Sequence, residues 1–339
     1  MKIWLDIANP AEARFLHAIG VELAKRGHRI FVTARENSIP VLKLLNFKDY
    51  ILVEGHGKNL VSKAIKTNLR TANLVSKIPR GINRLFSVES VSATLASKLL
   101  GIRSVLFTDN EKAKIQCYLG YNFADRIIAP NLIPKSMIES YLFFSKEIIS
   151  APGLKEQTYL RKFKPNKRIL EKLGISNDSR LIVVRPEPGL AAYSKNVQKN
   201  FQILVSACKE ILKNDPDSKI VLIPRYDYQR SYLKRFMKKL IIPEGPLDTL
   251  SLIYYSDWVV CAGDTMAREA ILLRKPTIIC YTGDLVTINK KLLSSGAAFF
   301  SITPREIANI ISVDRKPSFV FIGSLKDPTR TILETILTD

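Results

Sequence analysis

The first 160 residues alternate short apolar runs with segments in which apolar residues recur at helical spacing. The apolar runs predict strands at 3–7, 29–33, 85–88, 104–107 and 126–129, with helices between them. Runs of this kind are typical of parallel strands that are covered on both faces. This part of the chain therefore predicts an open parallel sheet with helices on both sides.

A second alternation follows a break at 151–166, where proline, glycine and basic residues read as a linker. Its strands are expected at 181–184, 220–224, 258–261 and 277–280. The length of 339 residues also favours two domains. We therefore expect an N-terminal domain at 1–160, a C-terminal domain at 166–322 and a closing helix at 323–339.

Ligands of doubly wound sheets bind beyond the carboxyl ends of the strands. In the C-terminal domain, the residues expected there are Arg185, Tyr226, Gly263, Asp264, Thr265, Met266 and Glu269. In the N-terminal domain, they are Asn9, Glu12, Asp109, Asn110 and Glu111. Two such rows suit a cleft that holds a donor and an acceptor.

The segment after 258–261 predicts an anion site, because a helix follows the strand after a small polar turn. The free backbone N–H groups of such a helix start attract phosphate. Glu269, one turn into the helix, is placed to bind ribose hydroxyls. Asp264 adds a negative charge beside this anion, and it could instead act as an N-cap of the helix. Either phosphate binds with weaker affinity through the N–H groups of Thr265 and Met266, or the activity of this protein is altered.

Four of these side chains have a chemical and an ordinary structural interpretation. The planar guanidinium of Arg185 suits a diphosphate, although a salt bridge to Glu187 would also explain it. Glu12 could accept a proton from an acceptor hydroxyl, and the acids of the 109–111 turn are the second candidates for this base. Carboxylates also stabilise helix starts, so their position alone does not decide between the two roles.

Several motifs carry a family resemblance. Gly-Asp-Thr-Met-Ala-Arg-Glu-Ala at 263–270, followed by Lys-Pro at 275–276, resembles the nucleotide-binding half of GT-B glycosyltransferases and of non-hydrolysing UDP-N-acetylglucosamine 2-epimerases. Trp-Leu-Asp-Ile-Ala-Asn-Pro at 4–10, Thr-Asp-Asn-Glu at 108–111 and Val-Arg-Pro-Glu-Pro at 184–188 extend it. With these, nearly the whole chain resembles a mostly archaeal family of uncharacterised proteins in that superfamily. The resemblance implies an α/β protein of the GT-B type, with two Rossmann-like domains facing across a cleft.

The resemblance implies a glycosyltransferase that moves a sugar from a nucleotide-diphosphate sugar to an acceptor. Arg185 and the helix N–H groups would stabilise the leaving group, so neither a metal nor a further cofactor is required. A 2-epimerase is the alternative, but those enzymes carry a catalytic histidine where Val184 stands and Thr-Glu-Arg-Pro-Glu where 282–286 reads Thr-Gly-Asp-Leu-Val. No G-x-G-x-x-G motif follows the first strand and no Walker motif occurs, which argues against nicotinamide, flavin and P-loop chemistry.

The charge of the chain favours polyanionic partners, because 52 basic residues stand against 31 acidic ones, a net charge of +21. Residues 55–88 contain seven Lys or Arg residues and no acid, with apolar residues at roughly helical spacing. This segment predicts a surface for anionic membrane, with Lys63, Lys66 and Arg70 on it, and an isoprenoid phosphate as acceptor. An ordinary domain helix would explain the same pattern. A nucleic-acid-binding protein is the third alternative, but no RNP, zinc-finger or KH signature is present.

The compartment is expected to be the cytoplasm, with peripheral attachment to the membrane. The start of the chain, Met-Lys-Ile-Trp-Leu-Asp, lacks the apolar core of a secretory signal. The four cysteines are widely separated and the three histidines do not cluster with them. We therefore expect reduced core thiols and no zinc site.

Overall fold

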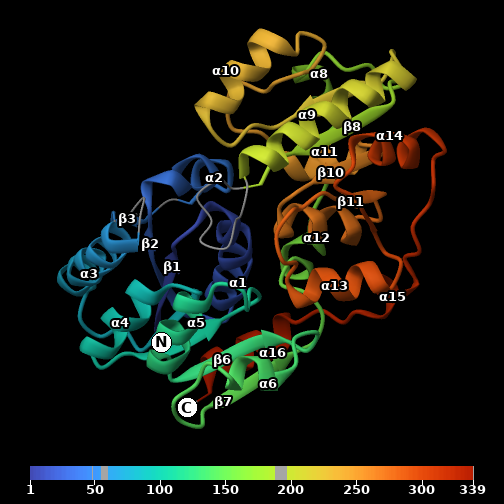
Figure 1. The fold of residues 1–339 in the computed structure, drawn as a ribbon. Coiled ribbons are helices and arrows are strands. Elements are labelled where there is room, and N and C mark those ends of the chain that lie inside the picture. The colour runs from blue at the N-terminus through green and yellow to red at the C-terminus, as the bar shows by residue number, and fades with distance from the viewer. Residues whose placement is uncertain (48, 55–59, 188–196, 339) are drawn as a thin grey trace. The chain divides into compact units, whose positions relative to one another are not determined.

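The computed structural model describes residues 1–47, 49–54, 60–187 and 197–338, and Figure 1 shows the course of the chain. The chain divides into two compact units. Unit 1 comprises Met1–Arg161 and Lys326–Asp339, and unit 2 comprises Lys162–Leu325. Each unit is an α/β structure built on one parallel sheet.

Unit 1 contains a parallel sheet with the order β3-β2-β1-β4-β5-β6-β7. Its strands are β1 (Lys2–Ile7), β2 (Arg29–Ala34), β3 (Ile51–Leu52), β4 (Arg84–Val88), β5 (Arg103–Phe107), β6 (Arg126–Pro130) and β7 (Glu147–Ala151). The order reverses between β1 and β4, where Asp6 stands beside Ser87. The pattern missed β3 and β7, because β3 has only two residues and β7 mixes polar with apolar residues at the edge of the sheet.

Helices cover both faces of this sheet. They are η1 (Pro10–Glu12), α1 (Ala13–Lys25), η2 (Glu36–Ser38), α2 (Ile39–Leu44), α3 (Leu60–Lys77), α4 (Val91–Leu99), α5 (Lys114–Phe123), α6 (Lys135–Glu139), α7 (Gln157–Leu160) and α16 (Thr329–Leu337). Alternate residues of β1 point to opposite faces, so Ile3 and Leu5 pack with α1 and α16 while Trp4 packs with α3 and α4. Burial on both faces explains why β1 is apolar at nearly every position.

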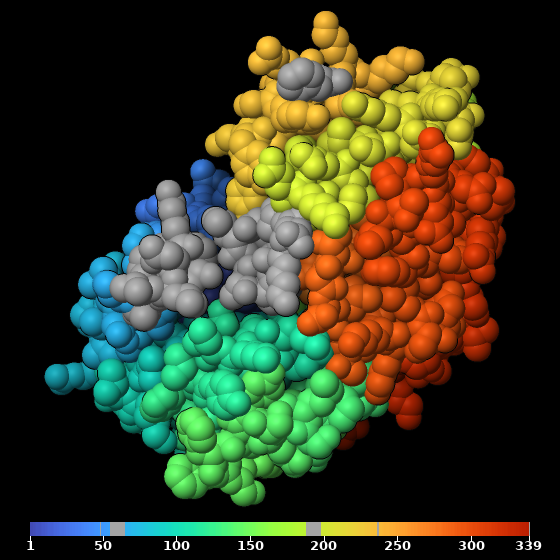
Figure 2. All heavy atoms as spheres, in the orientation of Figure 1, coloured from blue at the N-terminus to red at the C-terminus, as the bar shows by residue number. Residues whose placement is uncertain are grey.

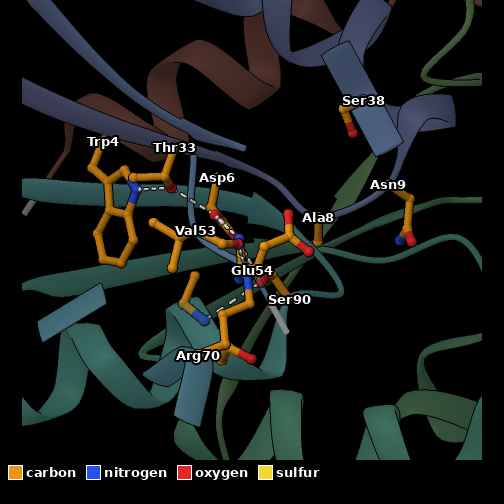
Figure 3. A network of polar contacts seen from close by, with 12 residues as sticks. Trp4, Asp6, Ala8, Asn9, Thr33, Ser38, Val53, Glu54, Arg70 and Ser90 are labelled. Atoms are coloured by element: carbon orange, nitrogen blue, oxygen red, sulfur yellow. Dashed lines mark hydrogen bonds and ion pairs between the residues drawn. The ribbon is translucent and has the colours of Figure 1, made fainter. Parts of the chain in front are cut away.

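A buried ion pair attaches α3 to the sheet, and Figure 3 shows it. Arg70 of α3 donates to both oxygens of Asp6 on β1, at 2.7 and 3.0 Å, and neither side chain is exposed to solvent. Thr33 and Ser90 also donate to Asp6. Burial alone would raise the pKa of Asp6, but the charge of Arg70 and these hydrogen bonds outweigh it and lower the pKa.

The position of Arg70 corrects the prediction that this side chain faces a membrane. The prediction is wrong because the guanidinium lies inside unit 1, on Asp6 and on the carbonyl oxygen of Val53. Residues 55–59 and the side chain of Lys63 lie outside the described part of the chain. On the rest of α3, Ile65, Lys66 and Leu69 are exposed.

Unit 2 contains a parallel sheet with the order β12-β11-β10-β8-β9. Its strands are β8 (Leu181–Arg185), β9 (Lys219–Leu222), β10 (Trp258–Cys261), β11 (Thr277–Ile279) and β12 (Phe299–Phe300). The order reverses between β8 and β10, where Arg185 stands beside Cys261. Its helices are α8 (Arg168–Lys172), α9 (Val197–Asn214), α10 (Asp227–Phe236), α11 (Thr249–Tyr255), α12 (Asp264–Leu272), α13 (Thr287–Ser294), α14 (Pro304–Ser312) and α15 (Val320–Ser324).

The α/β class and the two Rossmann-like units are confirmed. The end of the chain differs from the single helix expected at 323–339, because α15 ends at Ser324 and α16 begins at Thr329. Pro328 stands between them, and a proline cannot donate a helical hydrogen bond. The interruption lets α16 belong to unit 1, where Ile332 and Ile336 fill the core beside α1.

Candidate functional site

Each sheet has one point at which its strand order reverses, and ligands of doubly wound sheets bind beyond the carboxyl ends of the strands at such a point. In unit 1 the reversal separates β1 from β4, so the residues that follow are Ala8 and Asn9 on one strand and Glu89 on the other. In unit 2 it separates β8 from β10, which end at Arg185 and just before the Gly263 turn.

Glu12 lies at the reversal of unit 1, between η1 and α1, and is 5% exposed. Its Oε2 accepts the backbone N–H groups of Ala8 and Asn9, both at 3.1 Å, and its Oε1 accepts the side-chain amide of Asn9. Burial and, to a smaller extent, the charge of Glu89 raise the pKa of Glu12 to about 8, while Asn9 and Lys155 act to lower it. A raised pKa at a strand reversal makes Glu12 a candidate for a functional group.

Glu89 is a carboxylate of this site that the sequence did not single out. It follows β4 with a φ of 49°, a left-handed conformation that is uncommon for a residue other than glycine. This turn directs its Oε1 to the hydroxyl of Thr108 and to the backbone N–H groups of Asp109 and Asn110, at 2.8–3.1 Å. Burial and the charge of Asp109 raise the pKa of Glu89. Its signal in the sequence was an acid directly after a buried strand.

Asp109 is held in a buried ion pair with Lys155, whose Nζ lies 2.8 and 2.9 Å from the two carboxylate oxygens. Lys155 was also absent from the candidates, because 151–166 was interpreted as a linker. The turn that carries Lys155 depends on Gly153, which has a φ of 65° and where a Cβ would collide with the carbonyl oxygen of Lys326. Gly153 thus supplies the backbone conformation that leads the chain to Lys155.

The structure gathers most of the unit 1 candidates. Asn9 binds Glu12, Asn110 donates its backbone N–H to Glu89, and Asp109 pairs with Lys155. Glu111 is also buried in unit 1, and its carbonyl oxygen accepts the hydroxyl of Tyr141. The result is a cluster of acids around a single lysine, which we call the carboxylate cluster: Glu12, Glu89, Asp109 and Lys155.

Two arginines meet at the reversal of unit 2. Desolvation and the neighbouring charge of Arg225 together lower the pKa of Arg185 to about 9, and the charge of Glu269 acts in the opposite direction. Arg225 is fixed by a 2.9 Å hydrogen bond from its Nε to the carbonyl oxygen of Pro186. We call Arg185, Arg225 and Glu269 the arginine cluster. It carries two positive charges against one negative charge.

Gly263 lies in the turn between β10 and α12, beside the arginine cluster. A Cβ added to Gly263 would stand 3.0 Å from a terminal nitrogen of Arg225. The glycine therefore leaves room for that guanidinium at the start of α12. The N-cap of α12 is Gly263 itself, so the N-cap residue has no side chain that could accept a hydrogen bond from the helix start.

Asp264 is the first residue of α12, so the alternative that it serves as the N-cap is wrong. Its Oδ1 accepts the side-chain amide of Asn289 on α13 at 2.7 Å. Thr265 is half-buried and Met266 is buried in the first turn, and Glu269 follows as a buried acid. The backbone N–H groups of this first turn have no partners within the helix, which is the property that attracts phosphate.

Tyr226 follows Arg225 and precedes α10. Its ring stacks on that of Tyr228, with centroids 5.8 Å apart and planes inclined by 7°. Tyr226 is half-buried and Tyr228 is exposed, so the pair presents a flat aromatic surface close in sequence to the arginine cluster. Flat aromatic faces of this kind stack on nucleobases.

The cysteines are buried free thiols, as expected: Cys117, Cys208, Cys261 and Cys280. Burial raises the pKa of each to about 12. Within the described residues, no group of three or more His, Cys, Asp or Glu side chains could hold a metal ion. In the same residues, no helix is both long and apolar enough to cross a bilayer.

Comparison with known proteins gives one family and one fold. The family model described as "Protein of unknown function (DUF354)" matches residues 1–339. The uncharacterized protein MJ0665 of Methanocaldococcus jannaschii is 27% identical over 344 residues, which cover 99% of this chain and 98% of that protein. The family resemblance seen in the motifs is thereby confirmed.

Among solved structures, the UDP-GlcNAc 2-epimerase of Neisseria meningitidis bound to UDP-GlcNAc matches with a TM-score of 0.76 at 16% identity, over 100% of both chains. The UDP-GlcNAc 2-epimerase of M. jannaschii, in complex with UDP-GlcNAc and UDP, matches with 0.75 at 15% identity over 99% of both. The MurG protein of Acinetobacter baumannii matches with 0.55 at 14% identity, over 99% of this chain and 98% of that one. At such identities the likeness shows the shared fold, which is the GT-B type expected from the motifs.

Proposed function

We propose that this chain, which belongs to the family of proteins of unknown function DUF354, is a glycosyltransferase. It would move a sugar from a nucleotide-diphosphate sugar to an acceptor. The observation that carries the proposal is the arginine cluster, at the strand reversal of unit 2 and beside the first turn of α12. Two guanidinium groups and a row of backbone N–H groups suit a diphosphate. The UDP-GlcNAc and UDP bound by the M. jannaschii epimerase of the same fold support this class of ligand.

The roles in unit 2 follow from the chemistry of each group. Arg185 and Arg225 would bind the diphosphate oxygens and stabilise the charge that develops on the leaving group. The first-turn N–H groups of Thr265 and Met266 would bind the same phosphates. Glu269 would accept hydrogen bonds from the ribose. With these fixed positive groups, stabilising the leaving group requires no metal ion.

The carboxylate cluster of unit 1 supplies the proton chemistry. Glu12 has a pKa of about 8, so it can hold or release a proton near neutral pH. We assign it as the base that accepts the proton of an acceptor hydroxyl, with Glu89 as its electrostatic partner. Asp109 is less suited to this task, because Nζ of Lys155 already contacts both of its carboxylate oxygens.

A 2-epimerase is the second candidate, and the presence of Glu12 and Glu89 in one cluster favours it. Inversion of a carbon centre requires that a proton leave and another return, and two carboxyl groups of raised pKa could perform both steps. Against it, Val184, where epimerases carry a histidine, is buried in β8 at 1% exposure. Such a side chain cannot transfer a proton.

The test begins with ligand binding. Thermal unfolding would be followed with UDP-, GDP-, CDP- and dTDP-sugars, because a ligand that binds the folded state raises its apparent stability. The bound nucleotide sugar would then be incubated with candidate acceptors, and release of the nucleoside diphosphate would be measured. Transfer predicts release that depends on the acceptor. Deuterium uptake from D2O into an unreleased sugar would instead establish epimerisation, and no binding to any nucleotide sugar would refute both candidates.

A further inference from the structure

Large apolar side chains are exposed together on one part of unit 1. They lie on the outer side of α5 and in the segment 141–146, and between 39% and 77% of each is exposed: Ile115, Tyr118, Leu119, Phe123, Phe143 and Phe144. The spacing of the four on α5 is three, one and four residues, which places them on one helical face. In Figure 2 the teal surface of the α5 region adjoins the green surface of the residues that follow β6. We call these six residues the aromatic patch.

Hydrogen bonds hold the segment 141–146 firmly against α5. Asn122 donates to the carbonyl oxygen of Tyr141 and accepts the backbone N–H of Phe143, both at 2.8 Å. Lys146 donates to the carbonyl oxygens of Asn122 and Ala124 at the end of α5. The backbone that carries Phe143 is therefore fixed, and the exposure of this ring is a built feature of the fold.

Ring contacts join the two parts of the patch. Tyr118 of α5 stacks on Phe143, with centroids 6.2 Å apart, and meets Tyr141 edge to face at 4.9 Å. The hydroxyl of Tyr141 reaches the carbonyl oxygen of Glu111 at 2.8 Å. The patch is thus connected to the 109–111 turn of the carboxylate cluster. A partner that binds the aromatic patch would therefore lie close to the 109–111 turn.

The charges around the patch favour an anionic partner. Lys114 at the start of α5 is exposed and Lys112 is half-buried, while the nearby acids Asp125 and Glu147 pair with Lys98 and Arg126. The chain carries a net charge of +21, so a second copy of it would be repelled at low ionic strength. An anionic bilayer would attract the same surface, and its interface favours aromatic rings flanked by lysines.

We propose that the aromatic patch is a docking surface for anionic lipid bilayers, with Phe143 and Phe144 entering the interface. This surface differs from the one expected at residues 55–88, where Arg70 is buried in unit 1. Docking through α5 would bring a lipid-anchored acceptor next to the 109–111 turn. Binding to the bilayer itself does not require nucleotide sugar, so the surface can be tested apart from the proposed function.

The experiment measures sedimentation of the full chain with vesicles at low salt, either of phosphatidylglycerol and phosphatidylcholine in equal parts or of phosphatidylcholine alone. The unmodified protein is expected to sediment with the anionic vesicles and to dissociate as salt is added. Phe143→Ser combined with Phe144→Ser should lower the partition coefficient by at least about tenfold, because two large apolar side chains no longer leave water. Both rings are more than 70% exposed, so the fold should tolerate the change.

Ile65→Ser combined with Leu69→Ser is the matched control. It also removes two large apolar side chains that are more than half exposed, but on α3, and it should leave vesicle binding unchanged. A second measurement uses Phe144→Trp, whose fluorescence should shift to the blue when anionic vesicles are added. Trp4 and Trp258 are both buried, so the new indole alone would respond.

Four results would overturn the proposal. The first is an unmodified protein that ignores anionic vesicles. The second is a control variant that loses as much binding as the Phe143 and Phe144 variant. The third is self-association that this variant abolishes, without vesicle binding, which would identify the patch as a contact between copies. The fourth is RNA binding with a steep salt dependence, combined with indifference to vesicles.

Discussion

The carboxylate cluster of unit 1 and the arginine cluster of unit 2 occupy the same topological position and carry opposite charge. Both lie where the strand order of a parallel sheet reverses. The first places Glu12, Glu89 and Asp109 around one lysine, and burial raises the pKa of two of these acids. The second places two arginines around one acid, and burial lowers the pKa of Arg185. In each cluster, burial favours the neutral form of the majority group.

The same type of parallel sheet can therefore support either proton transfer or phosphate binding at its strand reversal. A surplus of buried acids is relieved by binding protons, so the cluster of unit 1 is suited to proton transfer. A surplus of half-buried arginines is relieved by an anion, so the cluster of unit 2 is suited to phosphate. Substitutions in each cluster test whether unit 1 transfers the proton and unit 2 binds the phosphate.

Glu12→Gln is expected to lower the turnover rate by about 10²–10⁴-fold, the usual contribution of a general base. The amide keeps the size of the side chain but cannot accept the proton. Nucleotide-sugar affinity, measured by calorimetry, should stay unchanged because the proposed donor site lies in unit 2. Turnover of the unmodified protein should rise as the pH approaches 8, where Glu12 becomes ionised.

The same variant has a stability signature with a definite sign. A carboxyl whose pKa is about 8 when folded and near 4.5 when unfolded binds more protons in the folded state. Its contribution to stability is therefore present below pH 4.5 and is lost as the pH rises to 8. Glu12→Gln should abolish this loss, so that urea unfolding at pH 8 shows a gain of about 2 kcal/mol or more relative to its effect at pH 5. An equal effect at both pH values would place the pKa of Glu12 in the ordinary range.

Arg185→Met is expected to weaken nucleotide-sugar binding by about 10–100-fold, since a charged hydrogen bond contributes about 1.5–3 kcal/mol. The free protein should become no less stable, because the substitution removes a half-buried charge that Arg225 repels. Calorimetry and urea unfolding of one sample would measure both quantities. A large loss of stability with unchanged affinity would show that Arg185 serves the fold of unit 2 and not an anion.

Glu269→Gln separates two roles by the sign of its effect. If the carboxylate accepts bonds from ribose hydroxyls, affinity should fall by roughly tenfold, at the lower end of the contribution of a charged hydrogen bond. If Glu269 only balances the arginines, its removal makes the cluster more positive, and affinity for inorganic pyrophosphate and nucleotide sugar should rise together. We expect the fall, with pyrophosphate less affected than nucleotide sugar.

Asp264→Gly is expected to have the smallest effect on binding, at most a severalfold gain from removing a charge beside the phosphate. It should also lower stability by about 1 kcal/mol, because Asn289 loses its acceptor. Asp264→Asn is the control, since it removes the charge but keeps an oxygen that can accept from Asn289. A large loss of affinity in both variants would mean that Asp264 binds the ligand directly.

The strands that line both clusters could be predicted from the sequence, because burial on both faces makes them apolar throughout. Residues at or soon after the ends of such strands, among them Asn9, Glu12, Asp109 and Arg185, could be named for the same reason. Strands β3, β7 and β12 could not, since a short or edge strand lacks this pattern. Glu89 carried the same signal as Glu12 but became conspicuous only through its left-handed φ and its hydrogen bonds to the neighbouring strand end.

The parallel α/β architecture, the family and the surplus of positive charge could be predicted from the sequence alone, because they depend on local pattern, motif order and composition. Which charged groups contact one another became known only from the tertiary structure. Asp109 pairs with Lys155, 46 positions later in the chain, and Asp6 pairs with Arg70, 64 positions later. Lys155 therefore belongs to the candidate site, and Arg70 is buried inside unit 1 instead of lying on the surface. The physical reason is that pKa and accessibility depend on neighbours in space, which chain crossovers bring together and a linear pattern does not record.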